Sequence, residues 1–346
     1  MRHKGIDAEQ IRTLKATGLS QRAIARQLNV DPATIRWHLS RSGAQPTRSI
    51  FDGEVSIPLE VTSERPVEVI IKDLDAHHER KQEFVDATTF IPVEFHEDKP
   101  IALAVIGDTH VDDPGSNRKL LTEHLELVND TPGMYACHIG DVGNSWGTKL
   151  RHLYAEQTTT ARETVRLVEH YIKMCRKWLF IVEGNHDRWA AEYDPIRGFM
   201  PELSSRIYQT TCSLNLTFPN GAECGVFAKH NLKGHSMWNV VHGAGKTAAM
   251  GIRYNIILSG HTHVAGINIR KDPDRRSGLD GGMHMHCLQV GTYKNIDKYA
   301  ETGDFHDHNI TPCWTCVINP HARGEVDFVT SLPSIHNAAK LLGALR

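Results

Sequence analysis

The sequence predicts an α/β protein, in which strands and helices alternate, preceded by a small all-helical module. One observation is a pattern that recurs from residue 101 onward: an apolar run of strand length ends, and polar side chains follow at once. The other is an abrupt change in charge. Residues 1–48 contain nine Lys and Arg against three Asp and Glu, a net charge of +6, whereas the whole chain of 346 residues carries −2. This asymmetry indicates a basic module attached to a neutral-to-acidic body.

Composition excludes some classes of protein. Hydrophobic residues make up 40% and charged residues 23% of the chain, as in ordinary globular proteins. No apolar run approaches the roughly 18–20 residues that a membrane helix requires, and no apolar signal segment follows the basic N-terminus. We therefore expect a cytoplasmic protein with no membrane partner.

The basic module predicts three short helices within residues 6–41. Asp7, Ser20 and Asp31 stand where each helix would be capped, and a tight turn at Asn29 separates the second helix from the third. Apolar residues recur at helical spacing and predict the buried face: Ile11, Leu14, Ile24, Leu28, Ile35 and Leu39.

Two helices joined by so short a turn resemble the helix-turn-helix of DNA-binding proteins. Ala25 takes the place of the small residue in that motif, and Asn29 stands where Gly is usual. The resemblance implies that the third helix enters the major groove of DNA, and that DNA is a partner of residues 1–45. The alternative to DNA binding is that the three helices form a cap or a dimerisation element. A homodimer is a candidate assembly. The residues expected at DNA are Arg22, Arg26, Arg36, Trp37 and Arg41.

Residues 46–99 are harder to interpret. Short apolar–polar alternations such as 67–71 predict strands of a small connecting element, interrupted by prolines. We divide the chain into this linker, a body over residues 100–332, and a C-terminal tail over residues 333–346.

The body repeats its pattern five times. The apolar runs cover residues 101–106, 134–139, 178–183, 225–229 and 256–259. Continuous apolar runs predict strands that are covered on both faces, and open α/β sheets place ligands beyond the carboxyl ends of their strands. We therefore expect the polar residues that follow to converge on one edge: Asp108, His110, Asp141, Asn185, His230, His261 and His263.

These donors indicate the chemistry of the site. Asp, Asn and His side chains without thiolates suit divalent metals, with manganese expected and iron, zinc or magnesium as alternatives. Seven donors exceed what one four-coordinate ion takes, and suit two ions that share a carboxylate.

The motifs resemble those of the calcineurin-like metallophosphoesterases. They occur in order over the body, as Gly107-Asp108-Thr109-His110, Gly140-Asp141, Gly184-Asn185-His186-Asp187 and Gly260-His261-Thr262-His263. The resemblance implies a four-layer α/β/β/α sandwich. It also implies two metal sites that share Asp141. One metal would take Asp108, His110, Asp141 and His263, and the other Asp141, Asn185, His230 and His261.

The same resemblance implies that His186 protonates the leaving group and that Asp187 orients it. His230 is preferred as the seventh ligand because it ends an apolar strand, with His242 and His235 as alternatives. Asn144 and Lys246 are expected at the substrate. Gly243–Thr247 invites a P-loop interpretation, which fails because Val240 replaces the first glycine of that motif. Cys313 and Cys316 are interpreted as buried strand residues, with a zinc or redox role as the alternative.

Together these features predict a dinuclear metal-dependent phosphoester hydrolase, and specifically a nuclease or phosphodiesterase that acts on DNA. A helix-turn-helix joined to such a domain resembles phage- and bacteria-encoded relatives of repair exonucleases. One alternative is a phosphatase or phosphodiesterase for a small molecule or phosphoprotein. Another is a DNA-binding regulator with an inactive metal site.

Overall fold

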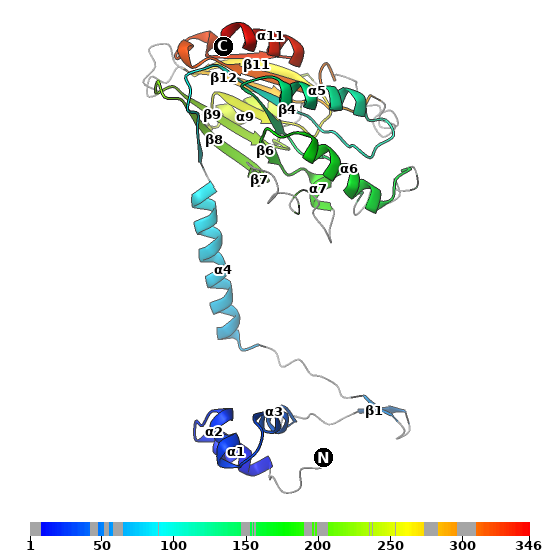
Figure 1. Ribbon diagram of the computed structural model, residues 1–346, viewed down its shortest axis with the longest axis vertical. Helices are drawn as coiled ribbons and strands as arrows, with labels where there is room; N and C mark the ends of the chain where they lie inside the picture. The colour runs from blue at the N-terminus through cyan, green and yellow to red at the C-terminus, as the bar shows by residue number, and fades with distance from the viewer. Residues whose placement is uncertain are drawn as a thin grey trace. The chain divides into compact units, whose positions relative to one another are not determined.

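The computed structural model describes two compact units, 1–78 and 79–346, and the division falls within helix α4, Val67–Thr88 (Figure 1). The described residues are 8–41, 48–51, 55–57, 65–88, 90–146, 153, 155, 157–189, 196, 198, 207–234, 236, 238–252, 254–272, 283–295 and 309–346.

The first unit contains the three predicted helices, α1 (Ala8–Ala16), α2 (Gln21–Gln27) and α3 (Pro32–Arg41). The Ser20 hydroxyl caps α2 by accepting the amide of Ala23, and Asp31 accepts the amide of Ala33 at 2.7 Å. Asn29 has a φ of 50°, so the turn takes the left-handed backbone that Asn tolerates. The core of this unit is formed by Ile11, Ile24, Ala25 and Ile35, with Leu14, Leu28 and Leu39 packed against it.

The linker differs from its prediction. β1 (Arg48–Phe51) and β2 (Val55–Ile57) form an antiparallel pair, as short strands were expected to. The strand prediction for residues 67–71 is wrong, because they begin α4, where the Pro66 carbonyl accepts the amides of Val69 and Ile70. Five residues of alternation are too few to distinguish a strand from a helix, and no Gly or Pro interrupts the 22 residues of α4.

The second unit is built on two six-stranded mixed sheets. The first sheet has the order β14 (Val329–Leu332), β13 (Cys313–Ile318), β4 (Ile101–Ile106), β5 (Met134–His138), β6 (Trp178–Val182) and β7 (Ile207–Gln209). The second has the order β11 (Gly266–Asp272), β12 (Met283–Gln289), β10 (Ile256–Ser259), β9 (Glu223–Lys229), β8 (Thr211–Thr217) and β3 (Ile91–Glu94). β3 thus belongs to the body, although it falls in the predicted linker.

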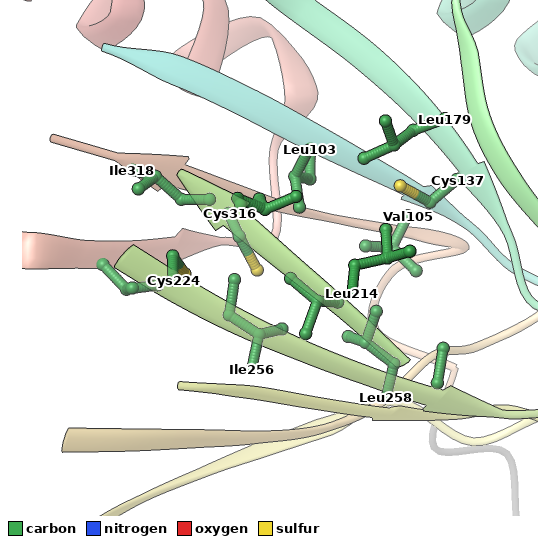
Figure 2. Close-up of a cluster of buried hydrophobic side chains, with 14 of the residues drawn as sticks. Leu103, Val105, Cys137, Leu179, Leu214, Cys224, Ile256, Leu258, Cys316 and Ile318 are labelled. Atoms are coloured by element: carbon green, nitrogen blue, oxygen red, sulfur yellow. The ribbon is translucent and has the colours of Figure 1, made fainter. Parts of the chain in front are cut away.

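Four layers result from what each sheet face buries. Side chains of both sheets meet in one core, where Leu103 and Val105 face Leu214, Ile256 and Leu258 (Figure 2). The outer face of the first sheet packs against α5 (Arg118–Asp130), α6 (Ala161–Met174) and α11 (Ile335–Leu345). That of the second sheet packs against α9 (His242–Ala249). The predicted α/β/β/α order is therefore confirmed.

The C-terminal segment is not a tail. Residues 333–346 contain α11, whose Ile335, Ala338 and Leu342 are buried in the core beside β13 and β4. Its Ser334 cap, which accepts the amide of Asn337, gave a start signal that the sequence prediction did not use. Among the described helices, α11 included, none is long and apolar enough to cross a membrane.

Two buried histidines away from the ligand cluster should make the body sensitive to acid. Burial lowers the pKa of both His124 and His286 to about 4. Both are neutral in either state above pH 6.5. As the pH falls from 6.5 toward 4, the unfolded chain takes up protons that the folded chain resists, so stability falls by up to ~3 kcal/mol per histidine.

We expect the free energy of unfolding, measured with urea, to fall between pH 7.5 and pH 4.5. His124→Gln should reduce the slope of this free energy against pH. His170→Gln, at an exposed position of α6, is the matched control and should leave the slope unchanged. An unchanged slope in His124→Gln would contradict the assignment.

Candidate metal centre

The predicted donors gather because of the sheet topology. β4, β5 and β6 are parallel neighbours in the first sheet, and β9 and β10 are parallel neighbours in the second. Their carboxyl ends lead into the loops that carry the seven predicted ligands. Asp108 and His261 show how closely the two sheets approach there, since the His261 amide donates to Asp108 Oδ2 at 2.8 Å.

Six of the seven donors fall into groups whose ligand atoms lie within 4.8 Å of one another. One group is Asp108, His110 and His263, and another is Asp141, His230 and His261. These correspond to the two predicted sets. A third group joins Asp141 and His110 to His186, so Asp141 stands beside His110 as well as beside His230. The seventh donor, Asn185, presents its Oδ1 3.0 Å from His230 Nε2.

Individual distances show that the donors converge. In the first group His110 Nε2 lies 3.1 Å from His263 Nε2, which is 3.5 Å from Asp108 Oδ2. In the second group His230 Nε2 lies 3.0 Å from Asp141 Oδ2. Carboxylate oxygens and imidazole nitrogens this close together, pointing at one another, are typical of a cation site.

Buried atoms without partners test whether metal ions fit. Asp108 Oδ1 and His110 Nδ1 are both buried and have no hydrogen-bond partner among the described residues. Burial raises the pKa of Asp108 to about 7, against the opposing pull of His230 and His263. A divalent cation would supply the positive charge that this buried carboxylate lacks. The residues present therefore fit the group that the donor set implies.

His230 is oriented as a ligand. Its Nδ1–H donates to the carbonyl of Ile139 at 2.8 Å, which leaves Nε2 facing Asp141 and Asn185. Ligating histidines commonly hold their second nitrogen this way. Although burial opposes its charging, Asp141 and Asp108 raise the pKa of His230 to about 10. His242 lies exposed on α9 and outside the groups, and His235 lies outside the described residues.

Backbone strain is concentrated at the ligands. His110, Asp141, His261 and His263 all have positive φ, of 39°, 55°, 75° and 56°. Left-handed backbone at a residue other than Gly costs on the order of 1 kcal/mol or more and persists only where the surroundings impose it. Its recurrence at four ligands is typical of a functional site.

Glycines permit the close approach of the loops. A Cβ on Gly184 would lie 2.1 Å from Asp141 Oδ1, and one on Gly260 would lie 2.7 Å from Asp108 Oδ1. Gly140 has a φ of 104°, and its Cβ would lie 2.8 Å from His230 Nδ1. The glycine in three of the four motifs therefore gives a carboxylate or imidazole the space that a side chain would fill.

Asp187 differs from expectation in what its carboxylate bonds. The Asp187 carboxylate accepts the backbone amides of Asp141, Val142 and Gly184 at 2.8–3.1 Å. It thus ties the loop after β5 to the loop after β6, and this role replaces the predicted orientation of His186. The partner of His186 is the carbonyl of Asn144, toward which its Nδ1–H points.

The two expected substrate residues differ in burial. Asn144 is buried, donates its side-chain amide to Asp113 Oδ2 at 3.2 Å, and has an unpartnered buried Oδ1. Lys246 is exposed on α9. Residues 243–247 are helical, which agrees with rejecting a P-loop.

Cys313 and Cys316 are both buried on β13 but join different cores, one on each face of the first sheet. Since they point in opposite directions, the pair does not form a metal or disulfide site. Burial raises the pKa of each thiol to about 12, as expected of inert strand cysteines.

Sequence reasoning missed Lys294. This lysine is only 8% exposed, its Nζ lies 3.1 Å from Asp113 Oδ2, and its charge contributes, after burial, to the lowered pKa of His110. It belongs to a loop after β12, in which Thr292 donates its hydroxyl to the Asp108 carbonyl at 2.7 Å. The sequence carried only a partial signal, because His284, His286 and Gln289 interrupt the apolar residues of the strand before Gly291 and Thr292.

Comparison with known families identifies the N-terminal unit. Residues 7–42 match the helix-turn-helix domain family. This segment is a helix-turn-helix domain. Its Arg22, Arg26 and Arg36 are exposed, as DNA contacts require, whereas the side chains of Trp37 and Arg41 lie outside the described residues. No curated protein matches the chain.

Solved structures resemble the body only distantly. The chain is 16% identical to vacuolar protein sorting 29 from Cryptosporidium parvum, covering 68% of this chain and 97% of that one with a TM-score of 0.36. The chain is 13% identical to calcineurin-like phosphoesterase YfkN from Bacillus subtilis, over 69% of this chain and 92% of that one, with a TM-score of 0.32. It is 15% identical to a metallophosphoesterase from Sphaerobacter thermophilus, over 71% of this chain and 95% of that one, with a TM-score of 0.30. The geometry of the donors, rather than these likenesses, is what supports a metal centre.

Proposed function

We propose that the body is a phosphoester hydrolase that uses two divalent metal ions, manganese in the first instance. The observation that carries this proposal is the pair of donor groups, Asp108–His110–His263 and Asp141–His230–His261, with Asp141 beside both. Divalent cations held there would lower the pKa of bound water and offset the negative charge of the phosphoryl oxygens. Asp108, His110 and His263 would hold one ion, and Asn185, His230 and His261 the other, with Asp141 between them.

The protein groups around the ions contribute positioning and proton transfer. Because the Asn144 carbonyl can only accept a hydrogen bond, it holds the His186 proton on Nδ1, and Nε2 is the nitrogen that would take up a proton from solvent and deliver it to the leaving oxygen. Lys294 places a buried positive charge near His110, where it would favour an anionic phosphoester. Asp187 keeps the Asp141 and Gly184 loops in register.

We further propose that the substrate is DNA and that the helix-turn-helix holds the chain on it. The net charge of +6 over residues 1–48 and the exposed Arg22, Arg26 and Arg36 support this. A phosphatase or phosphodiesterase for a small phosphoester is the second candidate, in which the helix-turn-helix would only target the enzyme to DNA.

One experiment separates these candidates. Full-length protein loaded with manganese would be assayed on single-stranded DNA, double-stranded DNA, bis-p-nitrophenyl phosphate and p-nitrophenyl phosphate. We expect hydrolysis of DNA and of the diester. Arg36→Ala should weaken duplex binding about 10-fold, through loss of a groove contact, and leave bis-p-nitrophenyl phosphate hydrolysis unchanged.

Each contrary outcome has its own meaning. Cleavage of the small esters but of neither DNA would favour the second candidate. Inactivity on all four substrates with manganese, iron, zinc and magnesium would refute the hydrolase proposal and favour a DNA-binding regulator. Equal duplex affinity in Arg36→Ala and the wild type would refute the groove contact.

A further inference from the structure

His186 is enclosed by three aromatic rings, two from loops and one from its own helix. The Trp189 ring centroid lies 4.4 Å from that of His186 at an interplanar angle of 56°, and Trp146 lies at 5.0 Å and 75°. His110, a predicted ligand, lies at 4.9 Å and 89°. His186 itself is only 9% exposed, so the two indoles cover it.

The indoles themselves remain half-buried, and each keeps part of its surface exposed. Trp146 follows β5 in the loop of Asp141, and Trp189 ends the short helix α7, Asn185–Trp189. Both indoles contact His186, which shares a donor group with His110 and Asp141. A flat aromatic group such as a nucleobase stacks favourably on an exposed indole face.

We propose that Trp146 and Trp189 form a stacking site for an unpaired nucleobase next to the scissile phosphate. This inference rests on the proposed function, and it specifies the substrate as single-stranded nucleic acid at the site. A paired base in a duplex keeps its faces within the stack and cannot reach an indole without being extruded. Stacking tolerates every base, so the site would select unpaired strand without selecting sequence.

The position of the site relates the base to the reaction. Both indoles contact His186, which the proposed function places at the leaving oxygen. The stacked base therefore belongs to the nucleotide on the leaving side of the cleaved bond. A role limited to holding His186 in place is the competing explanation, and it predicts no dependence on the presence of bases.

The test measures binding, so it does not depend on turnover. Full-length protein in calcium would be titrated into two fluorescein-labelled hexamers of equal charge, an oligothymidylate and an abasic sugar–phosphate chain. The titration would compare the wild type with the variants Trp146→Leu, Trp189→Leu and Trp238→Leu. Trp238 is a matched control because it is 95% exposed and has no ring contact with the described residues around His186.

We expect the wild type and Trp238→Leu to bind the thymidylate hexamer about 10-fold more tightly than the abasic one, as base–aromatic stacking implies. Each variant of the stacking site should reduce that preference to about 3-fold or less. Trp146→Phe and Trp189→Phe retain a ring and should restore part of it, and thermal melting would identify any variant that fails to fold.

The inference is overturned if folded Leu variants keep the full preference, or if they lose affinity for both hexamers by the same factor. A wild type that prefers the thymidylate hexamer yet hydrolyses no phosphoester would refute the proposed function alone. Hydrolysis without any preference for bases would refute the stacking site alone.

Discussion

Asp141→Asn is expected to reduce phosphoester hydrolysis by at least about 1,000-fold, equivalent to roughly 4 kcal/mol of transition-state stabilisation, while the fold persists. Asp141 belongs to two donor groups and is the predicted shared ligand, so its neutralisation weakens both metal sites at once. Asn tolerates the left-handed backbone at φ 55°, and its size preserves the packing. The measurements are turnover of bis-p-nitrophenyl phosphate and metal content per chain.

Asp130→Asn, at an exposed position on α5, controls for loss of one negative charge and should retain full activity. Wild-type turnover in Asp141→Asn at its normal metal content would rule out Asp141 as the shared ligand.

Gly184→Ala is expected to abolish metal-dependent activity by a different route. The added methyl group would lie 2.1 Å from Asp141 Oδ1 and 2.3 Å from its backbone nitrogen, so the loop after β5 must move. That loop carries Asp141, and Asp187 bonds it to Gly184. We expect metal affinity to fall at least 10-fold and unfolding stability by about 1–3 kcal/mol, as for other overpacked sites.

Gly343→Ala is the matched control, because nothing lies within 4 Å of a Cβ at that position of α11. Alanine in a helix should raise stability by about 0.5–1 kcal/mol, without any effect on metal binding. Calorimetric titration with manganese would measure both variants. If Gly184→Ala bound manganese as the wild type does, the close approach of the two loops would not matter to the site.

The body could be predicted from sequence because its strands are buried on both faces. Runs such as residues 101–106 are apolar throughout, and the polar residue after each run marks where the strand ends. The same logic favoured His230, which follows β9, over His242, which the structure places on α9. Local spacing therefore predicted the five strands that carry the donors, β4, β5, β6, β9 and β10, but not the other strands of the two sheets.

Other features depend on contacts that local patterns do not encode. Residues 67–71 alternate like a strand but continue as a helix of 22 residues. Asp187 was assigned to its sequence neighbour, yet its carboxylate bonds backbone 46 residues away at Asp141. Trp146 and Lys294 reach the site from loops that only tertiary packing brings together, whereas Trp189 lies on the same short helix as His186 and was not predicted at the site.

The left-handed backbone at His110, Asp141, His261 and His263 affects how mutagenesis of this centre should be interpreted. An alanine at any of these positions removes a donor and also imposes a conformation that alanine disfavours by roughly 1 kcal/mol. An alanine scan would thus mix two effects and overstate the affinity owed to each donor atom. Asparagine accepts this conformation and leaves only the change of donor, from carboxylate or imidazole to amide, so ligand strengths in this protein are better compared through asparagine substitutions.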